Sequence, residues 1–133
     1  MMGAELLAGA MAAAAQDIPP WGEAPKTIVY TDDSIRDKLN EKLVYMCYVT
    51  DADWQARKFY PGNKLILKLK DEVIGEGQII LVEATTMARL TRHDATISGY
   101  KDVEDLVHVL QKQMPMEKKW ESTEVYKILY RWL

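Results

Sequence analysis

Three leucines alternate with lysines along residues 64–70 (KLILKLK). Successive side chains of a β-strand point to opposite faces, so the leucines would share one face and the lysines, with Ile66 among them, the other. One buried and one solvated face is typical of an antiparallel strand at the surface of a domain. The pattern therefore predicts a half-buried antiparallel strand over these residues.

Four further segments are rich in the β-branched and aromatic residues that favour strands. They are 26–31 (KTIVYT), 43–49 (LVYMCYV), 78–87 (QIILVEATTM) and 123–133 (TEVYKILYRWL). The uncharged segment 43–49 predicts a well-buried strand. Glu83 is the one charged residue within 78–87 and is expected on a solvated face. Residues 71–77 (DEVIGEG) predict a turn, because Gly75 and Gly77 interrupt the β-forming residues.

Helix-start signals occur twice between residues 90 and 110. Thr91 with Asp94 has the spacing of a capping box, and Asp102 with Asp105 has the same spacing. Gly99 lies between them, where a residue with a positive φ commonly ends a helix. Apolar residues then recur at helical spacing and predict one core-facing stripe, formed by Val103, Leu106, Val107 and Leu110.

We therefore expect two short helices in this stretch. One or two helical turns are expected at 32–42, and a loop or a single helical turn at 50–64, which ends in a Pro-Gly-Asn turn signal. Short connections between most strands favour antiparallel pairing. The order of elements predicts an α+β fold, a small and mostly antiparallel β-barrel with short helices flanking it.

Residues 1–25 differ from the rest of the chain. The first sixteen are apolar and rich in Ala, and residues 16–25 contain three prolines and a glycine, which oppose regular structure. A secretory signal normally begins with Lys or Arg, and neither precedes the apolar stretch. We interpret residues 1–25 as an Ala- and Pro-rich N-terminal extension and residues 26–133 as one domain.

The composition narrows the class of protein further. The chain has 133 residues and no apolar run long enough for a transmembrane helix. Its single cysteine, Cys47, excludes an internal disulfide, and His93 and His108 offer too few ligands for a structural zinc site. A reducing cytoplasm is the expected compartment, and no motif indicates a cofactor.

The formal net charge of −3 argues against indiscriminate nucleic-acid binding. Charge is nevertheless unevenly distributed, since residues 51–93 carry 7 basic and 6 acidic side chains. An anion-binding surface is therefore expected in the middle third of the chain, although solvated basic residues on strand faces would give the same count.

The segment from Gly75 to Leu110 resembles the ASCH domain, a branch of the PUA-like superfamily. Members of this family show a Leu-Thr pair followed by Ala, then a Gly-aromatic pair, then a helix start. The matching elements here are Leu90-Thr91, Ala95, Gly99-Tyr100 and residues 102–106. Upstream, FYPGNKLIL is similar to a second family motif, with Asn63 in place of Asp. The resemblance covers residues 27–133.

This resemblance implies a small barrel with a pocket for RNA or modified nucleosides, and some bacterial members of the family are acetylcytidine amidohydrolases. The family signature G-x-K-x-x-T-x-R falls on Asn40, Lys42, Tyr45 and Cys47, so only the lysine is retained. The family's catalytic Glu falls at about Ser98, which cannot act as a carboxylate. These departures argue against an enzyme, because the catalytic Thr and Glu are both replaced.

Candidate ligand-binding residues fall into two groups. Lys42 could contact a phosphate, and Tyr45 could stack on a base; a surface lysine and a buried barrel aromatic are the structural alternatives. The second group interleaves aromatic rings with cations, as a surface for single-stranded nucleic acid requires, and consists of Trp54, Arg57, Lys58 and Tyr60. A tryptophan in a loop can instead pack as a lid on the core. We expect one pocket between the two groups.

Three functions remain open at this point. The first is a module that binds RNA or a nucleotide-like ligand, linked to RNA metabolism or translation and working without a membrane. The second is an amidohydrolase that acts on an acylated nucleoside, with Lys42 stabilising the oxyanion. The third is a protein-interaction module, for which the four tryptophans and the N-terminal extension would supply a surface. The sequence leaves the oligomeric state undetermined.

Overall fold

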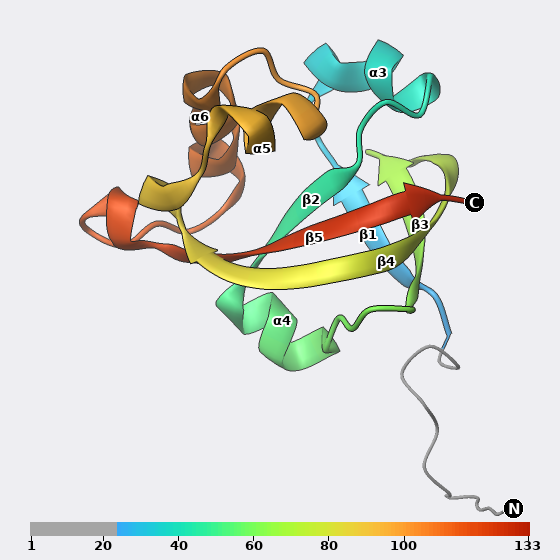
Figure 1. Cartoon of the computed structure of the whole chain (residues 1–133), viewed down its shortest axis with the longest axis horizontal. Coiled ribbons are helices and arrows are strands. Elements are labelled where there is room, and N and C mark those ends of the chain that lie inside the picture. Colours follow the sequence, from blue (N-terminus) through green and yellow to red (C-terminus); the bar gives the residue numbers. More distant parts are fainter. Residues whose placement is uncertain (1–23) are drawn as a thin grey trace, which may run out of the picture.

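The computed structural model describes residues 24–133 (Figure 1). Most of the expected extension, residues 1–25, lies outside the described residues, and the first strand begins at Lys26. The strands are β1 (Lys26–Tyr30), β2 (Met46–Thr50), β3 (Lys64–Leu69), β4 (Glu72–Thr86) and β5 (Glu124–Trp132). The α-helices are α3 (Arg36–Asn40), α4 (Asp51–Arg57), α5 (Arg92–Ile97) and α6 (Val103–Gln113). Short 3₁₀ turns are η2 (Asp33–Ile35), η3 (Met87–Arg89) and η4 (Trp120–Ser122).

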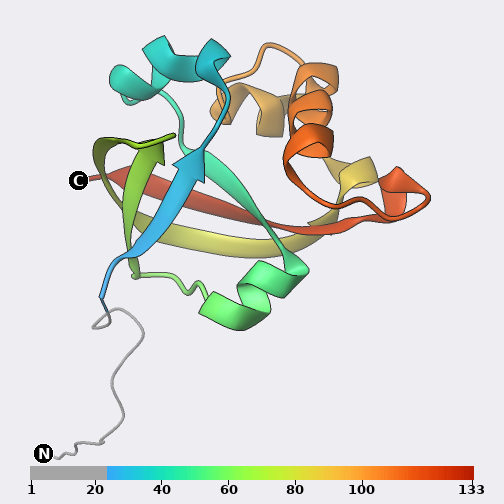
Figure 2. The ribbon, with the colours of Figure 1, turned by 180° about the vertical axis from the view of Figure 1, so that it is seen from behind.

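The five strands form one sheet in the order β1-β3-β4-β5-β2. β1 pairs with β3 in parallel, and every other neighbouring pair is antiparallel. The sheet curls until its two edge strands, β1 and β2, lie near each other (Figure 2). The Tyr30 hydroxyl spans this gap, donating to the Met46 carbonyl oxygen at 3.0 Å and lying 2.9 Å from the Tyr130 hydroxyl. The predicted α+β class and curled, mostly antiparallel sheet are confirmed.

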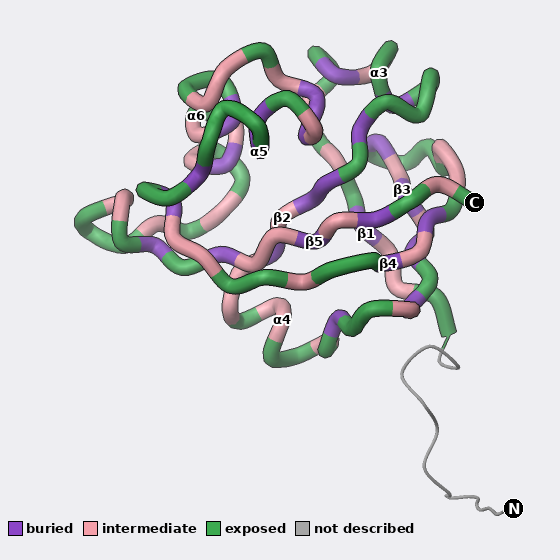
Figure 3. Tube along the Cα trace, in the orientation of Figure 1, coloured by how far each residue is buried: buried purple, intermediate pink, exposed green. Residues whose placement is uncertain are grey.

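The interior of the curled sheet holds the largest apolar cluster, and its pattern follows the alternation read from residues 64–70. Leu65, Leu67 and Leu69 are fully buried, while Lys64 and Lys70 are exposed (Figure 3). Leu65 and Leu67 pack with buried residues of β5 and β2, among them Ile128 and Cys47. Burying such side chains stabilises the fold by roughly 1.5–3 kcal/mol each.

The turn predicted over residues 71–77 is confined to Lys70 and Asp71, so the prediction was wrong for residues 72–77. β4 runs without interruption from Glu72 to Thr86, and the reversal occurs at Lys70, whose φ is 54°. The two glycines make room for aromatic rings instead. A Cβ at Gly75 would lie 3.2 Å from Trp132 Cζ3, and one at Gly77 would lie 3.0 Å from Tyr130 Cδ1.

The segment preceding β2 also differs from the expectation. β2 begins at Met46 rather than at residue 43, and Leu43 and Tyr45 are 47% and 38% exposed. Lys42 has a φ of 60°, which turns the chain out of α3. The Tyr45 N–H then donates to the Ile97 carbonyl at 2.8 Å, so this stretch lies against the end of α5 before it joins the sheet.

The helices agree with the sequence signals where capping residues define them. Thr91 and Asp94 form the predicted capping box of α5, and Gly99 follows that helix with a φ of 98°. Leu106 and Leu110 of α6 are buried, as their spacing predicted. α3, α5 and α6 gather on one side of the sheet and α4 on the other (Figures 1 and 2).

Glu83 lies on a solvated face, as expected, with 58% of its side chain exposed, and it pairs with Lys127 at 3.5 Å. Across residues 24–133, no helix is long and apolar enough to cross a membrane. The same part of the chain holds no group of three His, Cys, Asp or Glu side chains arranged to bind a metal ion.

Candidate functional site

Lys42 occupies a left-handed position at the end of α3. Its N–H donates to the Leu39 carbonyl at 3.0 Å, and the next residue, Leu43, donates to the Lys38 carbonyl at 2.8 Å. These bonds hold the turn, so the exposed Lys42 side chain projects from a fixed backbone toward the C-terminal end of β5. Its Nζ atom lies 5.0 Å from the centroid of the Trp132 ring, a cation–π distance.

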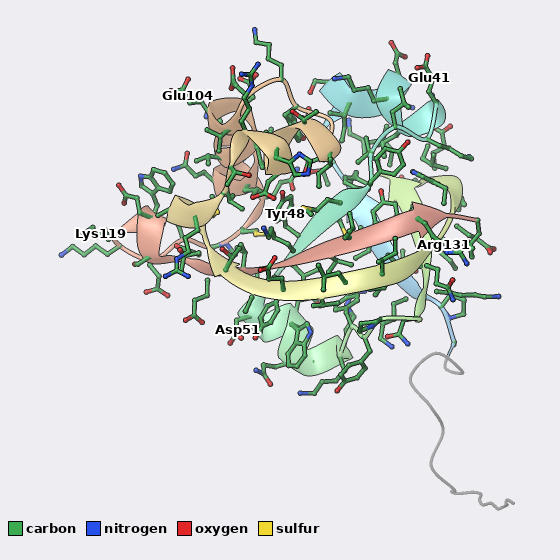
Figure 4. All side chains as sticks on the ribbon, viewed as in Figure 1. Glu41, Tyr48, Asp51, Glu104, Lys119 and Arg131 are labelled. Carbon is green, nitrogen blue, oxygen red and sulfur yellow. The ribbon has the colours of Figure 1, made fainter. Side chains whose placement is uncertain are left out.

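Lys42 lies at the rim of an open hollow of about 540 Å³, which we call the Lys42 groove. The groove is bounded by α5, by β4 at Ile80, by the end of β5 and by the segment before β2. Its lining residues are Lys42, Tyr45, Ile80, His93, Ile97, Leu129, Tyr130, Arg131 and Trp132. Figure 4 places Arg131 near the C-terminal end of β5. The sequence grouped Lys42 with Tyr45, and the structure brings these two residues to one site.

The charge of the Lys42 groove has one sign. Lys42 and Arg131 contribute the charged groups, and no carboxylate is among the lining residues. Lys42 and Arg131 form no salt bridge with any residue of the described chain. Arg131 is held by a neutral partner, since its Nη2 donates to Gln78 Oε1 at 2.6 Å. The groove therefore keeps its positive charge available to an anion.

The aromatic rings of the groove sit on well-anchored backbone. Trp132 Nε1 donates to the Val44 carbonyl at 2.8 Å, and its ring meets Tyr130 edge-on at 5.6 Å. Tyr130 N–H donates to the Tyr45 carbonyl at 3.0 Å, so both sides of the groove are tied by main-chain bonds. Tyr45 remains 38% exposed. A flat ring on a fixed backbone can stack on a planar ligand without first being ordered.

The second predicted group lies on and just after α4, and we call it the α4 cluster (Trp54, Arg57, Lys58 and Tyr60). The Trp54 ring is stacked on Tyr126, with centroids 4.9 Å apart and planes 9° apart. Its indole N–H donates to the Phe59 carbonyl at 3.3 Å, and Lys58 Nζ lies 4.7 Å from its ring centroid. Tyr60 meets Trp54 edge-on at 6.2 Å and is 36% exposed.

Arg57 is engaged within the protein. Its guanidinium donates to both carboxylate oxygens of Asp53, at 2.7 and 2.8 Å, and to the Thr27 carbonyl at 2.7 Å. It also lies over the Phe59 ring, 4.7 Å from the centroid. These contacts join α4 to β1, so Arg57 holds the helix in place and has little capacity left for a phosphate.

The α4 cluster and the Lys42 groove do not form one pocket. α4 lies on the opposite side of the sheet from α3 and α5 (Figures 1 and 2). The lining of the Lys42 groove includes no member of the α4 cluster. The two groups are therefore described as separate surfaces.

Sequence reasoning missed a small, partly open cavity of about 40 Å³ between β1, β2 and α6. Hydroxyl groups line it, and most are already paired. Tyr48 Oη lies 2.9 Å from Ser98 Oγ, and Tyr100 Oη donates to Asp32 Oδ2 at 2.8 Å. Figure 4 labels Tyr48 between α5 and the sheet. No motif marks this cavity, because it forms where the two edges of the sheet meet.

Two replaced signature positions, Cys47 and Ser98, line this cavity and not the Lys42 groove. Burial raises the pKa of the Cys47 thiol well above its usual range, so the residue is a small core side chain and not a nucleophile. Ser98 Oγ donates to the Asp94 carbonyl at 2.6 Å. Cys47 and Ser98 therefore lie apart from Lys42, whereas Tyr45 shares its groove.

Comparison with solved structures identifies the fold. An ASCH domain from Lactobacillus crispatus JV V101 superimposes with a TM-score of 0.58 at 8% identity, covering 80% of this chain and 79% of that one. Protein EF3133 from Enterococcus faecalis V583, assigned to DUF984, superimposes with a TM-score of 0.58 at 9% identity, covering 82% and 76%. No family model and no curated protein matches the sequence. The chain therefore has the fold of the ASCH domain, as its sequence resemblance predicted.

Proposed function

We propose that this ASCH-fold domain binds single-stranded RNA or a nucleotide-like ligand in the Lys42 groove. The observation that carries the proposal is the juxtaposition of exposed aromatic surface with cations and no carboxylate in one open hollow. Single-stranded nucleic acid requires both properties, because its bases stack on flat rings and its phosphates need neutralising.

The residues of the groove have distinct roles in this proposal. Lys42 and Arg131 neutralise phosphate oxygens, and the half-exposed Tyr45 ring offers a stacking face. Lys42 rests over Trp132 in the free protein, so a bound phosphate can draw the flexible lysine away and uncover the indole. Apolar contacts from Ile97 and Leu129 would line the side of a bound base.

The α4 cluster has a secondary role. Lys58 and the edges of Trp54 and Tyr60 can contact only a strand long enough to pass around the sheet, because the cluster lies on the other side from the groove. Arg57 is assigned a structural role, since its donors are already satisfied. A cytoplasmic location accords with the single, unpaired and buried Cys47.

The test is binding of a fluorescent single-stranded RNA, followed by anisotropy at several salt concentrations. Lys42→Glu and Arg131→Glu should each weaken binding at least tenfold and make log K less salt-dependent, by about 0.7 per lost phosphate contact. Lys64→Glu is the matched control, because Lys64 is an exposed lysine outside the groove. The proposal fails if the wild-type domain does not bind at about 50 mM salt, or if Lys64→Glu has the same effect as Lys42→Glu.

A further inference from the structure

The C-terminal half of β4 is an edge of the sheet. β3 pairs with β4 only from Glu72 to Gln78, and the loop residues Gly62 and Asn63 extend this contact to Ile79. Beyond that point, residues 81–86 pair with β5 and with no other strand of the described chain. We propose that two copies of the protein associate by pairing these edges antiparallel, so that one continuous sheet crosses the dimer.

The direction of the main-chain groups on this edge follows from the register. Tyr130 N–H donates to Tyr45, so alternate residues of β5, Ile128 and Tyr126, also direct their main-chain groups toward β2. Their neighbours in β4 are Val82 and Ala84. Those neighbours are in non-hydrogen-bonded pairs with β5, and their N–H and C=O groups point outward. Thr86 continues the alternation. Val82, Ala84 and Thr86 therefore each present a main-chain N–H donor and a C=O acceptor at the edge.

The edge is complementary to itself in one register. Centring a two-fold axis on Ala84 places Val82 opposite the partner's Thr86 and Glu83 opposite the partner's Thr85. Three hydrogen-bonded pairs then form, which is about six main-chain hydrogen bonds. The small, exposed Ala84 lies on the axis, and β-branched residues face each other on either side, a pairing that suits a sheet.

Two other registers, centred on Glu83 and on Val82, are worse for identifiable reasons. Centring on Glu83 would bring two carboxylates face to face, which destabilises a strand pair. Centring the axis on Val82 would place the partner's Thr85 opposite Ile79. The outward main-chain groups of Ile79 are already hydrogen-bonded to Gly62 and Asn63, so the loop occupies that position. The charge pattern and the loop therefore favour the axis at Ala84.

This edge also lacks the usual protection against pairing. Natural sheets shield edges with Lys, Pro, bulges or a covering element. Residues 82–86 contain neither Lys nor Pro, and the two register irregularities of β4, at Ile74 and Ile80, both lie before this segment. Glu83 is the only charge, and it is paired with Lys127 of its own chain. Leu81, which is 50% exposed, would lie beside the 3₁₀ turn that follows β4 in the partner.

The test is sedimentation equilibrium of the full chain without RNA, with Ala84→Pro as the disrupting variant and Ala84→Ser as its control. Proline removes an N–H that bonds nothing within the chain, so it should weaken association at least tenfold, whereas serine keeps the N–H and should leave association unchanged. Wild-type protein that stays monomeric up to about 1 mM, or an Ala84→Pro variant that associates like wild type, would overturn the proposal.

Amide hydrogen exchange of the wild-type protein gives a second measurement that needs no variant. The amides of Val82, Ala84 and Thr86 should exchange more slowly as protein concentration rises, while the outward-facing amides elsewhere do not change. Exchange at these three positions that is independent of concentration, in a sample that does dimerise, would show that another surface forms the interface and would refute the assignment.

Discussion

The Nζ atom of Lys42 lies 5.0 Å from the centroid of the Trp132 ring, which joins the turn after α3 to the last residue of β5. Gly75 of β4 makes this contact possible. A Cβ built there would lie 3.2 Å from Trp132 Cζ3 and 3.4 Å from Lys42 Nζ. Three segments far apart in the sequence thus meet at one wall of the Lys42 groove.

Gly75→Ala should displace the Trp132 ring and the Lys42 ammonium together. We expect a loss of stability of about 1 kcal/mol, because a flexible lysine and a partly exposed ring can shift, together with weaker RNA binding. Gly77→Ala is the comparison, since its Cβ would lie 3.1 Å from the Arg131 carbonyl oxygen, a backbone atom that cannot move aside. Chemical denaturation should show the larger loss for Gly77→Ala; the opposite order would contradict this explanation of the glycines.

Arg57→Gln should affect folding more than binding. The guanidinium donates to Asp53 and to the Thr27 carbonyl, and its side chain is 37% exposed, so screening reduces the expected loss to about 1 kcal/mol. Lys58→Gln removes the adjacent charge without breaking a contact to β1 and should leave stability unchanged. Urea denaturation of both variants, with RNA anisotropy alongside, checks the assignment, which is wrong if Arg57→Gln reduces RNA affinity at unchanged stability.

Thr91→Ala should shorten or loosen α5. The Thr91 hydroxyl accepts a hydrogen bond from the Asp94 N–H at 3.1 Å, and the Asp94 carboxylate accepts one from the Thr91 N–H at 2.9 Å. Losing an N-cap of this kind costs about 1 kcal/mol. Thr96→Ala, in the same helix, removes an exposed hydroxyl that donates to the Arg92 carbonyl and should cost less. Equal losses of thermal stability for the two variants would argue against the capping box as the determinant of this helix.

Asp32 should make stability depend on acid pH. Its partial burial would raise the pKa of the carboxyl, but hydrogen bonds from the Ser34 N–H, the Ser34 hydroxyl and the Tyr100 hydroxyl outweigh this effect and lower the pKa from 3.8. A group with a lowered folded-state pKa stabilises the protein above its unfolded pKa, and this contribution disappears as the pH falls through the folded value.

Tyr100→Phe removes one of those donors and should therefore reduce the stability lost on acidification below pH 3.8. Denaturant midpoints of wild type and variant, measured from neutral pH to about pH 2.5, provide the test. If the two curves stay parallel below pH 4, which is near the usual pKa of Asp, the Tyr100–Asp32 bond is not the source of the dependence.

Local patterns predicted the fold well because burial on a curled sheet repeats every two residues. Leu65 and Leu67, the capping box at Thr91 and the φ of Gly99 all follow from signals within a few residues. Gly75 and Gly77 misled the prediction because their role depends on Trp132 and Tyr130, far along the chain. A glycine that accommodates a ring from another strand and a glycine in a turn look the same in the sequence.

The candidate site was predictable only in part, for a similar reason. Lys42 and Tyr45 are close in sequence and share the groove, whereas Arg131 and His93 join them only through the fold. The α4 cluster lies apart from these residues. The residues of α4 alone do not indicate on which side of the sheet the helix packs, so the sequence could not predict this separation. The cavity beneath α6 depends on the meeting of β1 with β2, which no short motif records.

The parallel pairing of β1 with β3 has a consequence for the order of assembly. Among the strands of residues 24–133, β1 comes first in the chain, yet the strand it pairs with in that range, β3, ends at Leu69. The Tyr30 hydroxyl likewise makes its contacts with Met46 and Tyr130 only once β2 and β5 are in place. The β3–β4 and β4–β5 ladders need no help from β1. We expect β1 to dock last during refolding, and pulse-labelled hydrogen exchange that found β1 amides protected before those of β4 would refute this sequence of events.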